Sequence, residues 1–383
     1  MSYSKAQIAN LCTLVTSGGT PLTSVPAYYD PKEIPWLKTG EVNYCRIYDT
    51  ESYISKEGLA RSSAKMIPAN SVVVAMYGQG DTAGRVAINK IPLSTNQACC
   101  NLVINHVIAD YEYVYYALCT LYDRLVALKN GGAQPNLNAK KIKAIEIPFP
   151  DLETQRTIAS VLGVYDNLIE NNQKQIKLLE EAAQRLYKEW FVDLRFPGYE
   201  DTPIVDGVPE GWERLPVGEL IEKIPRTTQI MASEYWKEGP IPIIDQSREF
   251  IAGYTDNHAS LVNVGKPVIV FGDHTRILKY IQFPFAKGAD GTQLIVSNTD
   301  RMPQSLFYCS LVGVDLSNYH YARHFKYLKA EELLVPTQVI AEAFDRFVSP
   351  MFSKIQRLRD INKAATNARD RLLPKLMSGE IEV

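Results

Sequence analysis

The 383-residue sequence lacks the features of several common protein classes. It has no apolar stretch near the roughly 20 residues that a membrane-spanning helix needs, and its N-terminus leads into mixed polar sequence rather than an apolar signal core. Its six cysteines include no C-x-x-C pair and no Cys/His cluster with zinc spacing. We therefore expect a cytoplasmic protein with free thiols, no metal site and no membrane association.

Motifs of catalysis and nucleotide binding are also scarce. The sequence has no G-x-x-x-x-G-K-[ST], no H-E-x-x-H and no G-x-S-x-G. The segment Gly78–Ala83 fits G-x-G-x-x-A, but phosphate binding by that motif needs a helix directly after the glycines. Residues 85–88 favour a strand instead, so we interpret the segment as a glycine turn between two strands. We expect no catalytic activity from the chain alone.

Excess charge of one sign is absent as well. The chain holds 41 Lys and Arg against 43 Asp and Glu, a net charge of −2, which does not by itself indicate a nucleic-acid-binding protein. Residues 1–150 hold 14 basic and 11 acidic side chains, and residues 196–336 hold 13 and 18. Basic side chains gather between positions 266 and 287, so local basic patches are compatible with the sequence.

What the sequence does have is an internal duplication. Residues 142–150 resemble residues 328–336, which lie 186 positions further on, and each segment ends in a proline that opens a long helical pattern. Upstream, Ile34-Pro35 resembles Ile241-Pro242, and apolar strand-like runs follow both pairs. The duplication predicts two globular parts that share a plan and differ in their loops.

Each repeat continues into a helix with a heptad seam. Apolar residues spaced alternately four and three apart are typical of a coiled-coil seam. In the first helix, which we expect to begin near Asp151 and end before Pro197, the seam contains Ile158, Leu162, Tyr165, Ile169, Asn172, Ile176, Leu179, Ala183, Leu186 and Trp190. The offset of 186 predicts the second seam at Phe344, Val348, Met351, Ile355, Leu358, Asn362, Ala365, Arg369, Leu372 and Leu376.

The two seams need partners. Antiparallel pairing of the helices buries both seams, whereas in the alternative each helix only covers its own domain; we favour the pairing because heptads this long are typical of coiled coils. We expect Pro350 to kink or interrupt the second helix, and Pro374 to mark its end.

The remaining segments indicate mixed secondary structure. Residues 201–212 are rich in proline and acid and indicate a linker. Residues 111–129 favour a helix, and strands are predicted at 71–77, 98–104, 267–271 and 292–296. The fold class is therefore mixed α/β (α+β), with two globular domains separated by two long helices that form an antiparallel coiled coil. The predicted boundaries are 1–150 for the first domain, 151–197 for the central helix, 198–336 for the linker and second domain, and 337–383 for the C-terminal helix and tail.

Several segments resemble the specificity subunits of type I restriction-modification enzymes. Residues 148–159 are similar to the family's P-x-P-x-x-E-x-Q-x-x-I-A opening of the central helix. Further similar segments are 18–21, 34–37, 95–98 and 132–137 in the first half, and 272–276, 321–326 and 372–381 in the second. No single motif is decisive, but their order and the duplication together are specific to this family.

The resemblance implies a role and an assembly. Each globular part would be a target-recognition domain reading one part of a gapped, two-part DNA site, and the helices would set the spacer and dock two modification (methyltransferase) subunits. Restriction subunits would join for cleavage. S-adenosylmethionine, ATP and Mg would be bound by those partners and not by this chain.

Side chains that can pair with base edges, and neighbours that can contact phosphate, give the candidate DNA-binding residues. In the first half they are Lys38, Thr39, Gln79, Asp81, Thr82, Arg85, Gln97, Gln134 and Asn136. In the second half they are Gln246, Arg248, His274, Arg276, Lys279, Tyr321, Arg323 and Lys326. Each of them could instead be a solvated loop residue.

Charged residues off the first seam are candidates for partner binding, unless they form only a solvated face. They are Lys174, Lys177, Glu180, Arg185 and Lys188. The alternative function is a coiled-coil scaffold that joins proteins without DNA recognition. Salt-dependent DNA retention distinguishes the two functions, because phosphate neutralisation makes affinity fall with salt.

Overall fold

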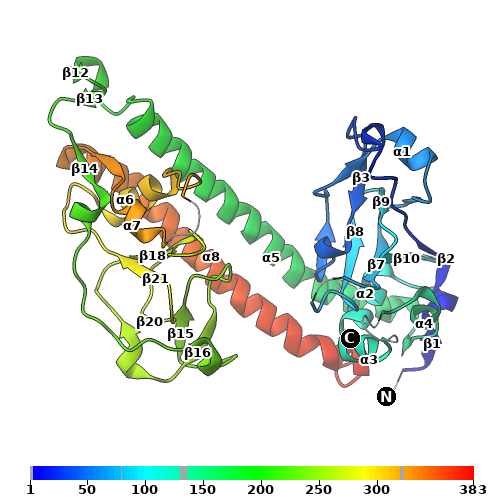
Figure 1. The fold of residues 1–383 in the computed structure, drawn as a ribbon. Helices are drawn as coiled ribbons and strands as arrows, with labels where there is room; N and C mark the ends of the chain where they lie inside the picture. Colours follow the sequence, from blue (N-terminus) through cyan, green and yellow to red (C-terminus); the bar gives the residue numbers. More distant parts are fainter. Residues whose placement is uncertain (1–2, 79, 130–135, 320–322) are drawn as a thin grey trace. The chain divides into compact units, whose positions relative to one another are not determined.

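The structure, a computed structural model, describes residues 3–78, 80–129, 136–319 and 323–383. The predicted DNA contacts Gln79, Gln134 and Tyr321 lie outside the described residues. The chain divides into two compact units (Figure 1). Unit 1 comprises residues 1–170 and 363–383, and unit 2 comprises residues 171–362. Each long helix therefore contributes one segment to each unit.

Unit 1 contains two principal sheets and a short antiparallel pair. The five-stranded sheet has the order β2 (Cys12–Ser17), β10 (Cys99–Ile104), β7 (Ser71–Ala75), β8 (Val86–Asn89), β4 (Cys45–Ile47). The four-stranded sheet has the order β5 (Tyr53–Ile54), β3 (Ile34–Leu37), β9 (Leu93–Thr95), β6 (Met66–Ile67). The short pair joins β1 (Lys5–Gln7) to β11 (Glu146–Pro148). The shorter helices are α1 (Lys56–Ala60), α2 (Tyr111–Cys119), α3 (Tyr122–Ala127) and α4 (Ala139–Lys143).

Unit 2 repeats this plan. Its four-stranded sheet has the order β16 (Gly253–Thr255), β15 (Ile241–Ile244), β20 (Phe285–Lys287), β17 (Leu261–Val262). Its three-stranded sheet has the order β19 (Leu278–Ile281), β18 (Val268–Gly272), β21 (Thr292–Ile295), and β14 (Glu213–Pro216) pairs with β22 (Glu332–Val335). The remaining short elements are α6 (Gln304–Val312), α7 (Phe325–Leu328) and a hairpin of β12 (Ile204–Val205) and β13 (Val208–Pro209).

The strand pairing confirms the duplication. The central strand β3 pairs in parallel with β9, and β15 pairs in parallel with β20. The buried strand β7 lies antiparallel between β8 and β10, as β18 does between β19 and β21. The long helices α5 (Leu152–Tyr187) and α8 (Gln338–Ser378) begin 186 residues apart, which is the offset of the sequence repeat.

The seam prediction is confirmed, because none of its twenty positions is exposed. The contacts in each unit are antiparallel. In unit 1, Arg369 Nη1 lies 2.7 Å from Asp166 Oδ1. In unit 2, Asn172 donates to Asn362 at 2.8 Å. Seam and flanking residues of both helices belong to the core of each unit: Leu376 and Met377 pack with Ile158 in unit 1, and Ala183 packs with Phe344 in unit 2.

The predicted helix ends need correction. The helix α8 continues through both Pro350 and Pro374, so the break expected as one alternative at Pro350 and the end expected at Pro374 are wrong. The kink expected as the other alternative at Pro350 stays a prediction. Burial on both sides of Pro350, by Val348 and Phe352, outweighs the one backbone hydrogen bond that a proline removes. The helix ends instead at Ser378, where Gly379 with φ +75° adopts the left-handed conformation of a C-terminal cap.

Three other segments differ in detail from the prediction. The predicted helix at 111–129 is two helices, α2 and α3, separated at Thr120 and Leu121. The first long helix leaves α-geometry after Tyr187 and makes a π-helical turn over Lys188–Val192, which buries both Trp190 and Phe191. The predicted linker at 201–212 contains the β12–β13 hairpin, whose two-residue turn Asp206-Gly207 has positive φ at both positions.

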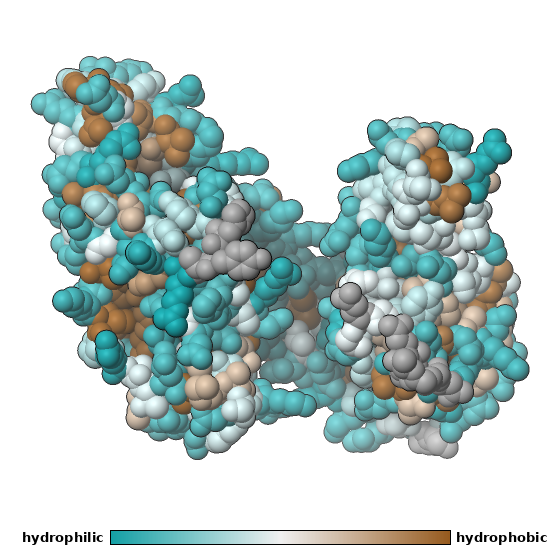
Figure 2. Space-filling model, viewed as in Figure 1, coloured by the Kyte–Doolittle hydropathy of each residue, from teal (hydrophilic) through white to brown (hydrophobic). Residues whose placement is uncertain are grey.

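Further properties of the chain follow from its side chains. All six cysteines are free, as predicted. No helix within the described residues is long and apolar enough to cross a membrane. Figure 2 shows hydrophilic residues over most of the visible face, with hydrophobic residues in scattered groups.

Candidate functional site

The predicted site residues of unit 1 lie on four connecting segments that meet at the ends of β3, β7 and β9. The segment after β3 begins with Lys38, whose ammonium lies 5.3 Å from the centre of the Trp36 ring. The loop after β9 is tied to β3 by a hydrogen bond from Asn96 N to Leu37 O of 2.9 Å. Because β3 and β9 are parallel, the segments that follow them leave the same edge of the sheet.

The β7–β8 connection holds three of the predicted residues: Asp81, Thr82 and Arg85. Arg85 pairs with Asp81 at 2.5 Å and donates to Asn43 Oδ1 at 2.9 Å, which ties this connection to the segment after β3. The hydrogen bond to Arg85 lowers the pKa of the Asp81 carboxyl, so Asp81 stays ionised and offsets the charge of Arg85. The fourth segment joins here through Leu137 N, which donates to Met76 O at 3.0 Å; the adjacent Asn136 is exposed.

Close backbone packing explains the Gly18-Gly19 pair at the same edge. A Cβ added at Gly18 would lie 2.0 Å from the carbonyl oxygen of Thr95. Gly19 donates to that oxygen at 2.9 Å and accepts a bond from Trp36 Nε1 at 3.0 Å. Thr20 then bonds to the side chain of Gln97, which holds an exposed predicted residue in place.

The equivalent segments of unit 2 converge in the same way. Gln246 follows β15 and bonds to Asp290 O, in the loop after β20, at 2.9 Å. Its Oε1 accepts from His274 N, in the β18–β19 turn, at 3.0 Å. In that turn Arg276 donates from Nη2 to Tyr319 O at 3.2 Å, so the segment before α7 joins the group.

Electrostatically, the two loop groups differ. In unit 2 the side chains of Arg248, His274, Arg276, Arg323 and Lys326 are all exposed, and of these Arg276 bonds to a neutral carbonyl. In unit 1 the ion pair between Arg85 and Asp81 leaves Lys38 as the exposed predicted cation of the group. The unit 2 loops therefore expose more of the predicted basic residues, although Glu249 and Asp290 beside them are exposed as well.

Two predicted residues are buried. The side chain of Lys279 in β19 is 4% exposed, bonds to Glu249 O and lies 3.8 Å from Asp245. Burial lowers the pKa of Lys279, and the neighbouring carboxylates oppose that shift. Thr39 is also buried, at 8% exposure. Both side chains have structural surroundings and do not form part of the exposed loop surface.

Sequence reasoning missed residues that hold these loops. Asn43, Tyr122, Thr275, Tyr319 and His324 all bond to a loop backbone or to a predicted residue. His324 is buried, and its ring nitrogens lie 2.8 Å from Asp273 O and 3.1 Å from Tyr319 O. These hydrogen bonds join positions 5 to 51 residues apart, so no local sequence pattern predicts them.

Neither a nucleotide site nor a metal site emerges from the described residues. Among them, no three His, Cys, Asp or Glu side chains group as metal ligands. The segment that follows Gly80 leads into strand β8 and not into a helix, as predicted, so the dinucleotide motif lacks its phosphate-binding helix end.

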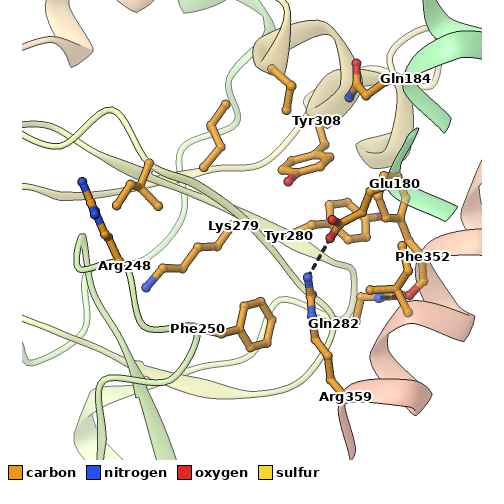
Figure 3. A pocket seen from close by; sticks show the side chains of 14 residues that line it. Glu180, Gln184, Arg248, Phe250, Lys279, Tyr280, Gln282, Tyr308, Phe352 and Arg359 are labelled. Carbon is orange, nitrogen blue, oxygen red and sulfur yellow. Dashed lines mark hydrogen bonds and ion pairs between the residues drawn. The ribbon is translucent and has the colours of Figure 1, made fainter. Parts of the chain in front are cut away.

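Unit 2 contains a cavity of about 430 Å³ (Figure 3). Its lining includes Tyr280 and Tyr308 with the cations Lys279 and Arg359. Both cations are already engaged: Arg359 bonds to Glu180 at 2.9 Å and lies 4.2 Å from the centre of the Phe250 ring. A third cation, Arg248, also lines the cavity and is exposed, so two of the three cations of the lining are engaged within the protein.

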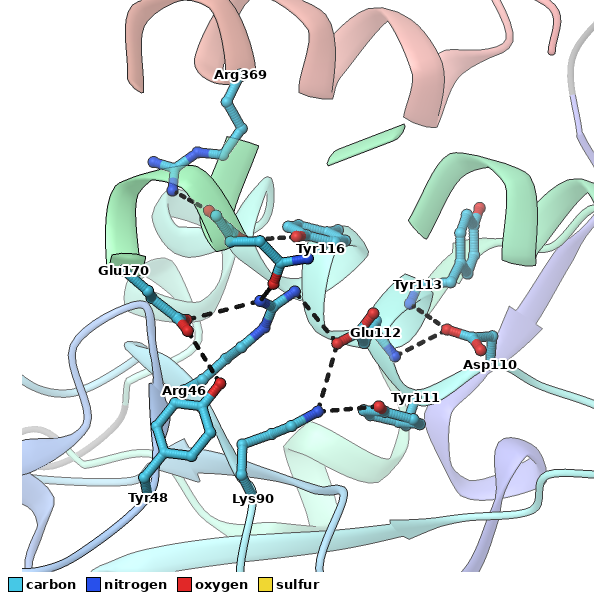
Figure 4. A network of polar contacts seen from close by, with 12 residues as sticks. Arg46, Tyr48, Lys90, Asp110, Tyr111, Glu112, Tyr113, Tyr116, Glu170 and Arg369 are labelled. Atoms are coloured by element: carbon cyan, nitrogen blue, oxygen red, sulfur yellow. Dashed lines mark hydrogen bonds and ion pairs between the residues drawn. The ribbon is translucent and has the colours of Figure 1, made fainter. Parts of the chain in front are cut away.

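A polar network fixes the first domain to α5 within unit 1 (Figure 4). The Arg46 side chain on β4 is 5% exposed and reaches Glu112 at 3.2 Å, Glu170 at 3.6 Å and Asn167 at 2.5 Å. Burial lowers the pKa of Arg46, but Glu112 and the other acidic neighbours outweigh it and raise the pKa overall. Arg46 therefore remains a cation that connects strand β4 and helix α2 to α5.

The predicted partner-binding residues lie on the α5 segment of unit 2 and its π-helical end. Lys174, Lys177, Arg185 and Lys188 are exposed, while Glu180 pairs with Arg359. Large apolar side chains that sequence reasoning passed over are also exposed on the long helices. On α5 they are Val164 (63%) and Leu168 (40%) in unit 1 and Leu178 (63%) in unit 2, and on α8 they are Val339 (72%), Phe347 (58%) and Ile361 (45%) in unit 2.

Fold and site together define a class: a duplicated α/β protein whose halves present equivalent polar loops and contribute to paired long helices. A family model described as "Type I restriction modification DNA specificity domain" matches residues 3–181. The chain is 27% identical over 401 residues to the type I restriction enzyme MjaIX specificity subunit of Methanocaldococcus jannaschii, with 96% of this chain and 91% of that protein covered.

Two further similarities agree. The EcoR124I/EcoR124II specificity subunit of Escherichia coli is 28% identical over 182 residues, which cover 47% of this chain and 45% of that protein. In fold, the chain is similar to the crystal structure of the S subunit from M. genitalium, with a TM-score of 0.64, 18% identity, and 98% and 96% of the two chains covered. Residues 3–181 therefore resemble the DNA specificity domain of type I restriction-modification enzymes, and the relative that aligns with nearly the whole chain is named a specificity subunit.

Proposed function

We propose that each unit reads one part of a two-part DNA site with its four converging loops. The observation that carries this proposal is the equivalence of the two loop groups: each follows the same strands of the repeated fold. Residues chosen from the sequence for base and phosphate contact lie in these loops in both halves. The exposed members can reach a duplex, since direct readout requires side chains that enter a groove.

In this proposal the unit 1 surface consists of Lys38, Asp81, Thr82, Arg85, Gln97 and Asn136, and the unit 2 surface of Gln246, Arg248, His274, Arg276, Arg323 and Lys326. Gln97 and Gln246 are amides suited to adenine, and Arg276 is suited to guanine. Lys38 and Lys326 would act mainly on phosphates, which set register and carry no sequence information.

The long helices would hold the two reading surfaces at a set separation and bind the partners. Exposed apolar side chains on the helices support docking there, because such residues gain by burial against another protein. We propose two modification subunits, one for each half of the duplicated chain, with restriction subunits joining for cleavage. S-adenosylmethionine, ATP and Mg would then be bound by the partners.

Methylation mapping tests this function. The chain and its modification partner are expressed in cells, and the methylated sites are sequenced for the wild type, a Lys38→Ala/Gln97→Ala variant and a Gln246→Ala/Arg323→Ala variant. Each double variant should relax or abolish preference in one part of the site and leave the other part unchanged. Equal loss at both parts, or wild-type sites from both variants, would contradict the assignment of one part to each loop group.

The alternative of a scaffold without DNA recognition is tested by binding. DNA retention by the complex of chain and modification partner should fall steeply as salt rises, because released counterions favour binding at low salt. The unit 2 variant Arg323→Ala/Lys326→Ala should show a smaller salt slope than the wild type. Retention that is absent, or independent of salt, would favour the scaffold.

A further inference from the structure

An amide pair, buried at Asn172 and half-buried at Asn362, interrupts the apolar seam of the two long helices in unit 2. Asn172 on α5 donates from Nδ2 to Asn362 Oδ1 on α8 at 2.8 Å, and the Asn172 residue is 3% exposed. The seam positions around the pair are apolar, including Ile176, Leu179 and Leu358. Buried amides of this kind cost stability when unpaired and act as register and partner selectors in coiled coils.

The repeat relates this pair to an apolar pair beside it. Under the offset of 186, Asn172 corresponds to Leu358, and Asn362 corresponds to Ile176. Because the helices are antiparallel, moving four residues from the amide pair in opposite directions places Ile176 opposite Leu358. Leu358 is 7% exposed and Ile176 packs against the unit 2 core, so this second layer is apolar.

The two layers respond differently to the choice of partner helix. Since α5 and α8 are repeats of each other, α5 could also pair in the same register with α5 of a second copy. In that pairing the Asn172 of each copy would face the Ile176 of the other copy. Two α8 helices that paired in the same way would place each Asn362 against the Leu358 of the other copy. The amide pair is matched only when α5 meets α8.

We propose that the Asn172–Asn362 pair directs α5 to the α8 of its own chain and excludes pairing with the equivalent helix of a second copy. A swapped dimer of two chains would leave four seam amides without their amide partners, two at the buried position 172 and two at the half-buried position 362, where two separate chains leave none. The pair thereby keeps one first domain with one second domain. If the proposed function holds, this keeps the recognised site asymmetric, but the selection itself does not depend on DNA binding.

Sequence changes that abolish or restore the selection provide the test. The Ile176→Asn/Leu358→Asn variant has matched amides in either pairing, and the Asn172→Ile/Asn362→Leu variant has none to match. Both should lose the selection, although one adds polarity to the seam and the other removes it. In the control, Asn172→Ile/Ile176→Asn/Leu358→Asn/Asn362→Leu, the amide pair moves by one layer with its composition unchanged, and the selection should persist.

The experiment uses full-length chains. Two differently tagged copies are co-expressed, mixed dimers are captured through both tags, and sedimentation velocity gives their share. We expect both selection-free variants to contain at least about tenfold more mixed dimer than the wild type and the control, a factor that corresponds to about 1.4 kcal/mol. Circular dichroism identifies any variant that fails to fold. If one selection-free variant does not fold, the dimer share of the other one tests the proposal.

Equal dimer shares in the wild type, the control and the folded selection-free variants would overturn the proposal, because chain connectivity alone would then select the partner. A control that dimerises as strongly as the selection-free variants would also overturn it. Neither outcome bears on DNA reading, which the methylation maps test separately, so failure here is distinguishable from failure of the proposed function.

Discussion

Replacing Arg276 with glycine should separate recognition from stability. Arg276 lies in the β18–β19 turn with φ +60°, a left-handed conformation that costs a non-glycine residue about 1–2 kcal/mol. Glycine removes that cost and also removes the bond from Nη2 to Tyr319 O, which is worth about 0.5–1.5 kcal/mol. The two effects oppose each other, so the free energy of unfolding should change by less than about 1 kcal/mol.

Recognition should change by more. If Arg276 reads a base, its loss should cost about 1–3 kcal/mol of binding free energy, or roughly ten- to a hundredfold in affinity, at one part of the site. The Arg276→Ala variant loses the same side chain and keeps the strained backbone. It should therefore be less stable than the glycine variant by about 1 kcal/mol and equally defective in recognition.

Urea unfolding measures the stability of both variants, and binding of the complex with its modification partner to oligonucleotides altered at single positions measures recognition. Lys223→Ala, at an exposed residue of unit 2 outside the four loops, is the control and should match the wild type. Affinity lost uniformly over all sequences would make Arg276 a phosphate contact. Affinity retained at every sequence would refute its place in the reading surface.

Other perturbations test the packing. Arg46→Met should lower the free energy of unfolding by about 2 kcal/mol in urea titrations, because it removes the guanidinium that pairs with Glu112 and Glu170. This is less than the cost of breaking a fully buried ion pair, since Lys90 still lies 3.5 Å from Glu112 and Glu112 is 21% exposed. An unchanged midpoint would contradict it. Leu179→Asp should cost several kcal/mol by placing a carboxylate in the seam, seen as a lower melting temperature by circular dichroism; a wild-type melt would argue against the paired helices. Burial raises the pKa of Cys100 and of Cys309 from 9.0 to about 12, so both stay protonated in the folded chain. Their contribution to stability is complete below about pH 9 and is lost as pH rises from about 9 to 12. Alkylation of native protein at about pH 8.5 should be slow at both thiols, and rapid labelling without unfolding would contradict this.

The sequence predicts those elements of the fold that a local pattern or the internal duplication encodes. The heptad seam, the helix start at Leu152 and the buried strands β7 and β18 were all predicted, because periodicity and apolar runs are local signals. The duplication extended the prediction to α8. The hairpin turn Asp206-Gly207 also carried a local signal, and it was missed because neighbouring prolines and acids favoured a linker.

The remainder depends on contacts between distant positions. A proline disfavours a helix locally, but Pro350 lies between buried Val348 and Phe352, so tertiary packing decides. Lys279 has a side chain suited to DNA contact, but its position on strand β19 buries it beside Asp245. The Arg46 network joins positions up to 124 residues apart, and no local pattern encodes such a partner.

The fold also lets the loops of each unit vary without moving the start of its long helix. Antiparallel neighbours such as β7 and β8 begin and end at the same sheet edge, so a connection between them can lengthen without moving either strand. The connections at this place differ accordingly: residues 76–85 join β7 to β8, whereas residues 273–277 join β18 to β19. The pairs β1–β11 and β14–β22 that precede the long helices keep the offset of 186 at β11 and β22. Loop changes can therefore alter the proposed reading surface of one half, while the start of its helix and the register of its seam stay fixed.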